Sequence, residues 1–461
     1  MSECIISDKV REQITAKAGL IGLGLKIREM GILQTLESEV KIAQKAVKYT
    51  PHEKLTDALI AILSGAKGLV EVNKRVRSDA ALQAAFGRDG CAEQSVVQDT
   101  LDACTASSVK QMQAAVDNIL RVHSQAAGHA YGKTWLILEV DMTGRPCGRK
   151  AEFASKGYFA KQRNRRGRQE GYVVSSQYEE IVVKRLYDGT TQLNTAFQPL
   201  MQAAQQALNL TAEQRGRIIL RVDSGAGSVE DVNWALEQGY QFNGKDYSGR
   251  RAEHLAESVA EWFTDPRDAN RQMGWVTEAS ELYKRPVKRI AVRCRKNNGQ
   301  WGTGVILSTL SAREVLILTG QSSDQENDPQ AVLLAYVHFY DQRGGGIEIE
   351  IKEDKQGLGM PKRNKKRFAA QQMVCQLEVL AHNLLIWARK WLTPLCPKFA
   401  RFGILRMVRD VLQITGVITI DQHRNIRKIV LNSADPFARH IQPGLASILA
   451  LEQVAVCLGE I

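Results

Sequence analysis

Two aspartates follow apolar segments that alternate in the manner of β-strands. The segment 133–141 (KTWLILEVD) ends on Asp141, and the segment 217–223 (RIILRVD) ends on Asp223. The alternation predicts two strands, each ending on its acid before a turn. Sites in open α/β sheets form at the carboxyl ends of strands, so the two carboxylates are expected to share one cleft. With a third acid they can hold two Mg²⁺ ions, or Mn²⁺ in their place, for phosphodiester chemistry.

A third acid lies among residues that suit phosphate binding. Tyr340, Arg343, Glu348 and Lys355 follow one another within sixteen positions. Glu348 and Lys355 are seven residues apart, which places them on one face if the segment is helical. We therefore predict Asp141, Glu348 and the aspartate at 223 as catalytic metal ligands. Tyr340, Arg343 and Lys355 are predicted to bind phosphates, the arginine by planar two-point contact.

With this order of acids the chain resembles the DDE transposases of bacterial insertion sequences. It is most similar to a cut-and-paste branch that has a Tyr-Arg-Glu-Lys signature around the last acid and a β-rich insertion before it. The stretches LRVDSGAGSVEDVNWALEQGYQFNGK (220–245) and NKKRFAAQQMVCQLEVLAHNLLIWAR (364–389) resemble the family's second-aspartate region and its final helix. The resemblance covers about residues 130–395.

This resemblance implies a ribonuclease-H-like core and a metal-dependent DNA transposase that cleaves element ends and joins the 3′-hydroxyl to target DNA. The implied partners are double-stranded DNA, both terminal inverted repeats and target, and a second copy of the chain in a homodimer on DNA. Two alternatives stay open. One is a ribonuclease-H-like nuclease that cuts without joining, and the other is a decayed transposase that only binds DNA.

The spacing of the last motif departs from the family pattern. Four residues separate Arg343 from Glu348, where the family usually has three, and the usual register would fall on Ile347, which cannot ligate a metal. In an unbroken helix the extra residue would turn Glu348 by about 100°. The glycines at 344–346 can absorb it, so we predict a break at 344–347, with Tyr340 and Arg343 on the helix before it. Glu350 is the alternative third acid.

The elements needed to position these residues predict an α/β chain with several parts. An all-α N-terminal part includes residues 79–106, whose two short helices and glycine turn resemble the outline of a helix-turn-helix. In the insertion, the segments 287–294, 301–309 and 312–320 are expected to be successive antiparallel strands. The expected parts are a helical DNA-binding domain (1–128), the first part of the core (129–254), a β-rich insertion (255–330), the second part of the core (331–395) and a C-terminal segment that could serve dimerisation (396–461).

Charge and composition agree with a polyanion partner. Lys and Arg number 62 against 50 Asp and Glu, a net charge of +12. Basic residues concentrate at 145–168, 284–296 and 362–367, which favours nucleic acid. Apolar runs are too short for a membrane helix and no secretory signal opens the chain, so we expect a cytoplasmic protein, bacterial and nucleoid-associated when bound to DNA. The eight cysteines form no CxxC pair and are expected to be reduced thiols.

A few further residues have weaker interpretations. Glu139 precedes Asp141 by two positions and could be an accessory ligand, although a hydrogen-bonding role is favoured. His382 lies in an apolar helical pattern and is expected to be a core histidine. Aromatic side chains that border the basic run 284–296 could stack on an extruded base, as related enzymes do. These are Trp275, Tyr283 and Trp301.

Overall fold

The structure is a computed structural model that describes residues 10–157, 159 and 164–461. It is a mixed α/β protein, as the sequence predicts. The chain packs as two units, which are described here one at a time. Unit 1 joins the described residues of Met1–Ser124 with Cys147–Ala154 and Glu350–Ile461, and unit 2 joins Gln125–Pro146 with the described residues of Ser155–Ile349.

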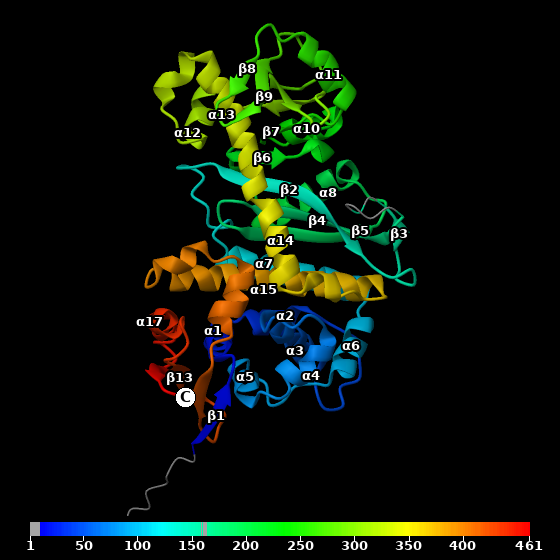
Figure 1. Cartoon of the computed structure of the whole chain (residues 1–461). Helices are drawn as coiled ribbons and strands as arrows, with labels where there is room; N and C mark the ends of the chain where they lie inside the picture. Colours follow the sequence, from blue (N-terminus) through cyan, green and yellow to red (C-terminus); the bar gives the residue numbers. More distant parts are fainter. Residues whose placement is uncertain (1–9, 158, 160–163) are drawn as a thin grey trace, which may run out of the picture. The chain divides into compact units, whose positions relative to one another are not determined.

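Unit 2 is built on one long mixed sheet (Figure 1). In its described part, ten strands pair in the order β3-β4-β2-β6-β7-β11-β10-β9-β8, with β5 also on β4. The strands are β2 (Leu136–Pro146), β3 (Ser155–Lys156), β4 (Arg166–Ser175), β5 (Glu180–Asp188), β6 (Ile218–Val222), β7 (Gln241–Lys245), β8 (Phe263–Asp265), β9 (Asp268–Trp275), β10 (Lys288–Arg295) and β11 (Trp301–Ser308).

The directions of the strands divide this sheet into two parts. β2 runs antiparallel to β4 and parallel to β6, and β6 runs parallel to β7. The expected β-rich insertion begins beyond β7, where β11 pairs antiparallel with β7 and leads to β10, β9 and β8. The insertion therefore extends the sheet that carries the acids. One expected strand is wrong: Ala312–Leu318 is the helix α12, which begins with a capping box between Ser311 and Glu314.

Helices cover this sheet, and α13 is the one that leads to the third acid. It begins at Pro329, a residue that suits the first helical turn, behind the cap of Asp328. Leu333 and Tyr336 of α13 pack into a buried core with Ile290 and Ile306 of the insertion strands. The helices of unit 2 are α8 (Leu193–Leu208), α9 (Ala212–Arg215), η2 (Ser224–Ala226), α10 (Val229–Glu237), α11 (Gly249–Glu257), α12 (Ala312–Leu318), η3 (Ser323–Asn327), α13 (Pro329–Asp341) and η4 (Gln342–Gly345).

Unit 1 is mainly helical around α15 (Phe368–Leu392), which is buried along most of its length and contacts α3, α6 and α7. Its other helices are α1 (Ala18–Glu29), α2 (Ile32–Glu39), α3 (Pro51–Leu63), η1 (Leu69–Glu71), α4 (Val72–Arg75), α5 (Ala80–Ala85), α6 (Gln94–Asp102), α7 (Ala106–His123), η5 (Met360–Lys362), η6 (Pro397–Arg401), α16 (Ile404–Arg406), the π-helix η7 (Met407–Leu412) and α17 (Ala438–Ile448). The helix α14 (Ile347–Gly357) begins in unit 2 and continues into unit 1.

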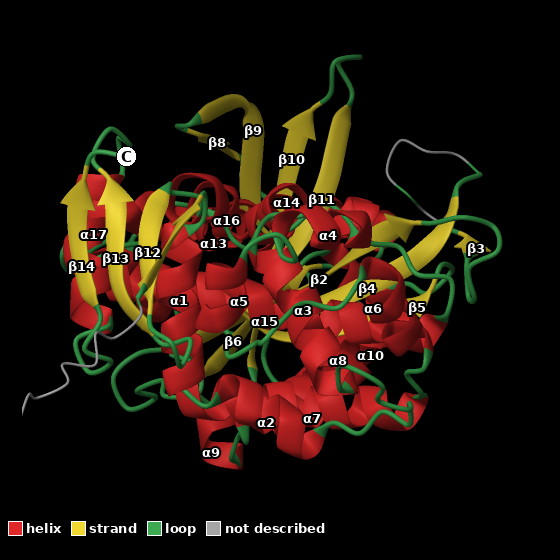
Figure 2. Ribbon diagram, turned by 90° about the horizontal axis from the view of Figure 1, so that it is seen from below, coloured by secondary structure: helices red, strands yellow, loops and turns green. Residues whose placement is uncertain are grey.

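A small sheet completes unit 1, and Figure 2 shows three of its strands side by side. Its order is β1-β12-β13-β14, with antiparallel pairing from β1 to β13 and parallel pairing of β13 with β14. Helix α1 packs against β12 and β13. The strands are β1 (Arg11–Thr15), β12 (Gly416–Ile420), β13 (Ile426–Asn432) and β14 (Ala455–Gly459).

The segment 79–106 does not fold as a helix-turn-helix. Eight residues separate α5 from α6, whereas that motif joins its helices by a turn of three or four residues. Helix α5 packs against α1, and α6 packs against α3 and α15. The helix-turn-helix interpretation is therefore wrong, while DNA binding by the N-terminal residues stays a prediction.

The basic runs are less exposed than the sequence suggests. In the run 145–168 both Arg145 and Arg168 are buried, and Arg145 pairs with Glu170 at 2.5 Å. In the run 362–367 Arg363 and Lys365 are buried as well. Part of the first run, residues 158 and 160–163, lies outside the described residues. These four buried side chains are not exposed to a polyanion. Fewer Lys and Arg residues of the basic runs are therefore available for DNA than their number in the sequence implies.

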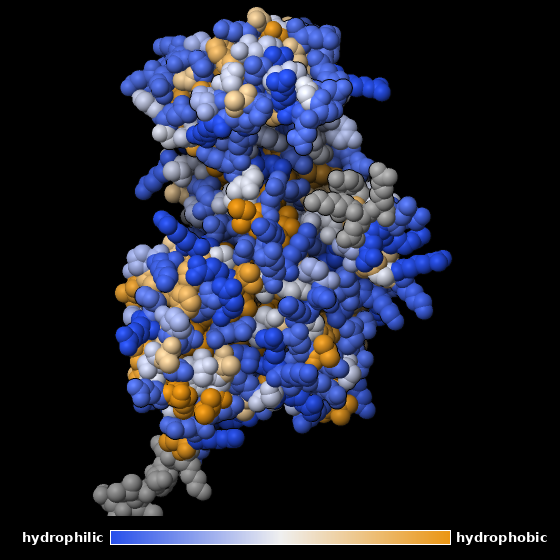
Figure 3. All heavy atoms as spheres, in the orientation of Figure 1, coloured by the Kyte–Doolittle hydropathy of each residue, from blue (hydrophilic) through white to orange (hydrophobic). Residues whose placement is uncertain are grey.

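The face of the molecule that Figure 3 shows is mainly polar. Figure 3 shows hydrophilic side chains over most of the visible face, with apolar side chains in small patches. Among the residues that the structure describes, no helix combines the length and the apolar character needed to cross a bilayer.

Candidate active site

The register of two parallel strands brings the aspartates together. Glu139 of β2 lies opposite Arg221 of β6, and the strands pair up to Val140 and Val222. One position further on stand Asp141 and Asp223. The sequence predicts that the first strand ends at Asp141, and this is wrong. The strand β2 continues to Pro146 because it pairs with β4 over this length. Asp223 follows β6 directly, and its carboxylate accepts the Gly225 N–H at 2.7 Å.

A buried ion pair lies two positions before the two aspartates, on the same faces of β2 and β6. Glu139 and Arg221 are almost fully buried, and their side chains meet at 2.5 Å. Arg221 also donates to the carbonyl oxygen of Phe339 and to the side chain of Gln342, both at 3.2 Å. It therefore fixes the end of α13 above β6. Glu139, two positions before Asp141, accepts hydrogen bonds from Arg221 and from the Ile347 N–H, which agrees with the hydrogen-bonding role that the sequence favoured.

The chain breaks between α13 and α14, as the extra residue requires. Helix α13 ends at Asp341, a 3₁₀ turn covers Gln342–Gly345, and α14 begins at Ile347 after Gly346, whose φ and ψ are −102° and −115°. The Glu139 carboxylate accepts the Ile347 N–H at 2.7 Å, and a Cβ on Gly346 would overlap this carboxylate. The predicted break is confirmed, with one correction: Arg343 lies in the 3₁₀ turn and not on α13.

Arg343 pairs with two of the three acids and feels the charge of the third. Its guanidinium lies 3.3 Å from the Asp141 carboxylate and 2.8 Å from the Glu348 carboxylate. The charge of Asp223 also acts on Arg343, and together with the other two acids it raises the pKa of the guanidinium against the effect of burial. Arg343 thus joins Asp141 of β2 to Glu348 of α14, and Asp223 stands beside Asp141 by the register of β2 and β6. The three carboxylates do not all lie within 4.8 Å of one another.

The cluster holds more negative charge than its arginine can balance. Burial and then the charge of Asp223 raise the pKa of Asp141 to about 6, with a smaller contribution from Glu348 and an opposing effect of Arg343. Side-chain exposure rises from 19% at Asp141 to 52% at Glu348, so the cluster is open to solvent on the α14 side. Carboxylate oxygens with surplus negative charge are the donors that Mg²⁺ prefers, so the chemistry of these residues suits a divalent metal.

The remaining predicted residues fall in different places. Burial raises the pKa of Tyr340, and the charge of Arg343 opposes this effect. Lys355 lies in the last turn of α14, on the face of that helix that carries Glu348 because the helix is continuous between them. Glu350 belongs to unit 1, where its carboxylate lies 3.7 Å from the buried His382. Glu348 is therefore the acid that reaches Arg343. His382 also contacts Asp354 at 2.7 Å and is a core histidine, as expected.

A groove of about 430 Å³ borders Tyr340 on the insertion strands. Its floor is the face of β10 and β11 that carries Gly302 and Gly304, and the stems of Lys245 and Lys296 lie against these glycines, where a Cβ would meet them. Neither ammonium forms an ion pair with a described carboxylate. The groove, which Glu253 also lines, therefore offers two lysines without such an ion pair next to Tyr340.

Two of the three aromatic residues that are predicted to stack on a base, Trp275 and Trp301, contact other side chains in the structure. Trp275 packs edge-on against Tyr336 of α13, at 5.7 Å between ring centroids. Trp301 is 39% exposed, and the Arg293 guanidinium lies between it and Trp262 at 4.8 and 3.9 Å. Base stacking stays a prediction for all three rings.

The family model described as "Transposase DDE domain group 1" matches residues 7–453, nearly the whole chain. The chain belongs to this family. Among solved structures it is similar to the piggyBac transposase in a cryo-EM synaptic complex with hairpin DNA, at 12% identity and a TM-score of 0.44, over 86% of this chain and 79% of that one. A search of curated protein sequences gave no match.

In this DDE-family chain, sequence reasoning missed the supporting role of Arg221. It precedes Asp223 by two positions, just as Glu139 precedes Asp141, so both pairs lie on the same faces of their strands. Opposite charges at equivalent positions of two adjacent strands were a usable signal for an ion pair. The contact of Gly346 with Glu139 had no comparable signal, because it depends on where α13 ends in space.

Proposed function

We propose that this chain is a DNA transposase that cleaves the ends of a mobile element and joins the freed 3′-hydroxyl to target DNA. Membership of the DDE family supports a DNA-processing enzyme. The observation that supports the assignment to residues is that Arg343 pairs with both Asp141 and Glu348, while the strand register places Asp223 beside Asp141. The strand order β5-β4-β2-β6-β7, with β2, β6 and β7 parallel, supports a ribonuclease-H-like core.

Asp141, Asp223 and Glu348 would hold two Mg²⁺ ions. Such a pair of ions, when bound, activates an oxygen nucleophile and stabilises the leaving oxygen of a phosphodiester. The acids supply oxygen ligands from a rigid strand pair and from α14. Gly346 and Glu139 fix the start of α14 and thereby the direction of Glu348.

In this proposal Arg343 pairs first with the acids and then, once DNA is bound, with a phosphate. In the structure it neutralises Asp141 and Glu348, and its planar group has the geometry for two-point contact with a phosphate once those acids have other counter-charges. Tyr340 lies close enough to Arg343 for their charges to interact, and it is proposed as a second phosphate contact. The groove with Lys245 and Lys296 begins at Tyr340, so the DNA backbone would continue from the scissile phosphate along the insertion strands. Lys355 is proposed as a further phosphate contact.

The test starts from binding, because the terminal repeats are unknown. Selection from randomised duplexes yields the bound sequence, and oligonucleotides that carry it are then incubated with the chain and Mg²⁺ or Mn²⁺. A transposase cleaves at the edge of the bound sequence and joins pre-cleaved 3′-hydroxyl ends to a plasmid. Cleavage without joining would identify a nuclease. Binding without either reaction, in both metals, would contradict the proposed function.

A further inference from the structure

A second basic cavity, remote in sequence from the acids, lies among the N-terminal helices of unit 1. It measures about 400 Å³, within the range of small-ligand sites. Three segments form it: the loop and first turn of α3 at 44–54, Arg77 after α4, and residues 91–96 at the start of α6. Its charged lining residues are Lys45, Lys48, Lys54, Arg77 and Glu93.

Lys54 is the least expected of these cations, because it is only 3% exposed. Its ammonium donates to the Gln44 side-chain oxygen at 3.2 Å, and that oxygen also accepts the Thr100 hydroxyl at 2.7 Å. Among the described residues no carboxylate lies within ion-pair distance of this ammonium. A buried charge whose partner is a neutral amide is costly, and an anion in the cavity would remove that cost.

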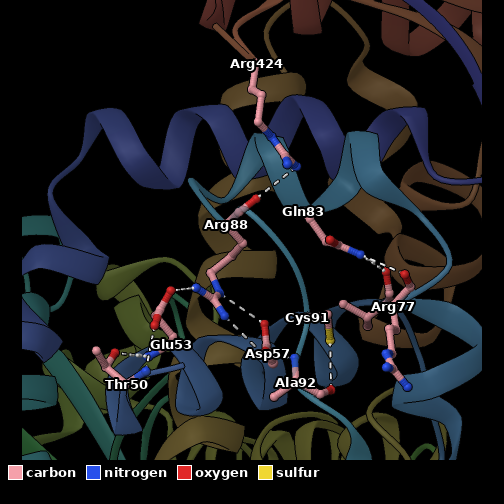
Figure 4. A network of polar contacts seen from close by, with 10 residues as sticks. Thr50, Glu53, Asp57, Arg77, Gln83, Arg88, Cys91, Ala92 and Arg424 are labelled. Atoms are coloured by element: carbon pink, nitrogen blue, oxygen red, sulfur yellow. Dashed lines mark hydrogen bonds and ion pairs between the residues drawn. The ribbon is translucent and has the colours of Figure 1, made fainter. Parts of the chain in front are cut away.

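The nearby acids are already used. Figure 4 shows Arg88 directed at Asp57 and Glu53, which are the carboxylates closest in sequence to Lys54. Asp57 also accepts the Ala92 N–H at 2.8 Å. In the same view the side chain of Arg77 points away from this cluster, and no described carboxylate pairs with it. The lining of the cavity therefore carries four basic side chains and one acidic side chain, the exposed Glu93.

The walls of the cavity are apolar and aromatic. Tyr49 is held against Gly90, where a Cβ would collide with its hydroxyl, and its ring lies 5.3 Å from the Arg88 guanidinium. Val47 and Val96 line the cavity as well. The first turn of α6 adds the partial positive charge of a helix N-terminus. Anionic groups attached to a flat or apolar body fit this combination.

We propose that this cavity binds a phosphate ester of a nucleotide. The nucleotide is either part of a DNA strand or free, and the two sources share the chemistry that Lys54 and Arg77 recognise. The DNA source rests on the proposed function, whereas the cavity itself does not depend on the acids of unit 2. Its occupant would complete the missing counter-charge of Lys54.

The first experiment measures DNA binding by the full chain in EDTA, where cleavage cannot interfere. A duplex of arbitrary sequence is titrated by fluorescence anisotropy at several salt concentrations. Arg77→Gln and Lys54→Met are each expected to lower the slope of log K against log salt by about 0.9, the loss of one phosphate contact. Lys74→Gln is the matched control, because Lys74 is an exposed lysine of α4 outside the cavity, and its slope should equal that of the unchanged chain.

The second experiment tests the free source and separates a binding role from a structural one. dAMP and inorganic phosphate at millimolar concentration are added in thermal unfolding, and a rise in Tm that Arg77→Gln removes would identify a free nucleotide as the occupant. Without ligand, Lys54→Met should not lower Tm, since it removes a poorly compensated charge. A lower Tm with unchanged DNA slope and no ligand effect would overturn the proposal and make Lys54 structural.

These results are independent of the catalytic test. If the acids prove inactive but the slope falls in Arg77→Gln, the cavity stands and the proposed function fails. If cleavage by the acids is observed but neither variant changes the slope or the response to dAMP, the cavity binds no phosphate ester and the further inference fails.

Discussion

Arg88 in unit 1 and Arg343 in unit 2 both pair with two carboxylates, but the two clusters differ in burial and in the balance of charge. Arg88 faces Asp57 and Glu53, and these acids have additional donors in the Ala92 and Thr50 N–H groups. Arg88 and Asp57 are almost fully buried. The cluster is closed, and its partners join α3 to the loop before α6.

The Arg343 cluster has one acid more and remains open. Three carboxylates act on one guanidinium, and the Glu348 side chain is half exposed. Burial and mutual repulsion raise the pKa of Asp141 to about 6, so at neutral pH the fold holds this charge at a cost. Burial also raises the pKa of Asp57, so the closed cluster holds its charge at a cost too, but Arg88 and the Ala92 N–H compensate that carboxylate. The open cluster has more acids than arginines, so it is prepared for a further cation.

The largest effect on stability is expected at the closed cluster. Arg88→Met leaves the buried Asp57 carboxylate uncompensated and should lower the free energy of unfolding by about 3–5 kcal/mol. Arg343→Met should cost less, because its acids are more exposed, and Mg²⁺ should restore the loss by about 2.7 kcal/mol when present at 100 times its Kd. Urea unfolding with and without Mg²⁺ measures both. Equal losses, with Mg²⁺ ineffective in both variants, would contradict the distinction.

The largest effect on activity is expected at the open cluster. Asp141→Asn, Asp223→Asn and Glu348→Gln each remove a proposed metal ligand, so cleavage should fall by more than the roughly 10–100-fold that outer-shell partners cost. Stability of the metal-free chain should not fall at pH 7, and Asp141→Asn should raise it by about 1–3 kcal/mol, since a pKa raised by about two units reports a disfavoured charge.

Glu350→Gln is the control for the register of α14. Its carboxylate faces His382, so this variant should retain cleavage and change only stability. Loss of cleavage in Glu350→Gln with activity retained in Glu348→Gln would mean that the third acid has been misassigned.

An intermediate effect is expected where the backbone supports the open cluster. A methyl group on Gly346 would meet the Glu139 carboxylate that accepts the Ile347 N–H. Gly346→Ala should therefore displace α14, cost about 1–3 kcal/mol as an overpacked site does, and lower cleavage about 10–100-fold. Single-turnover cleavage and thermal unfolding test this, and full activity would show that the contact does not position Glu348.

The sequence predicted more of the open cluster than of the closed one. Asp141 and Asp223 are recognisable because strand periodicity and a following acid are local signals, and the break at 344–347 follows from counting residues on a helix. Arg88 lies in a glycine-bounded turn that resembled part of a helix-turn-helix, and its partner Asp57 is thirty-one residues away. Such a pairing depends on tertiary packing and leaves no periodic trace.

Mistakes about individual elements have similar causes. Ala312–Leu318 is apolar enough for a strand, and only the capping box between Ser311 and Glu314 indicates a helix. Charge along the sequence does not show burial: Arg145 of β2 is buried, and it pairs with Glu170 of β4. Local sequence patterns therefore predict most helices and strands and the candidate acids. The ion pairs of Arg88 and Arg145 cannot be predicted in this way, because their partners are brought close only by the tertiary fold.

The smallest effect is expected at the two glycines before Gly346. A Cβ on Gly344 or Gly345 would meet open space, and neither residue has the positive φ that disfavours other side chains. Gly344→Ala and Gly345→Ala should therefore keep the 3₁₀ turn and raise stability by about 0.4–1 kcal/mol, because alanine restricts the unfolded chain. Cleavage should stay close to that of the unchanged chain, in contrast to Gly346→Ala. If either variant loses cleavage as severely as Gly346→Ala, then freedom of the whole glycine run, and not the single contact with Glu139, is what lets Glu348 reach Arg343.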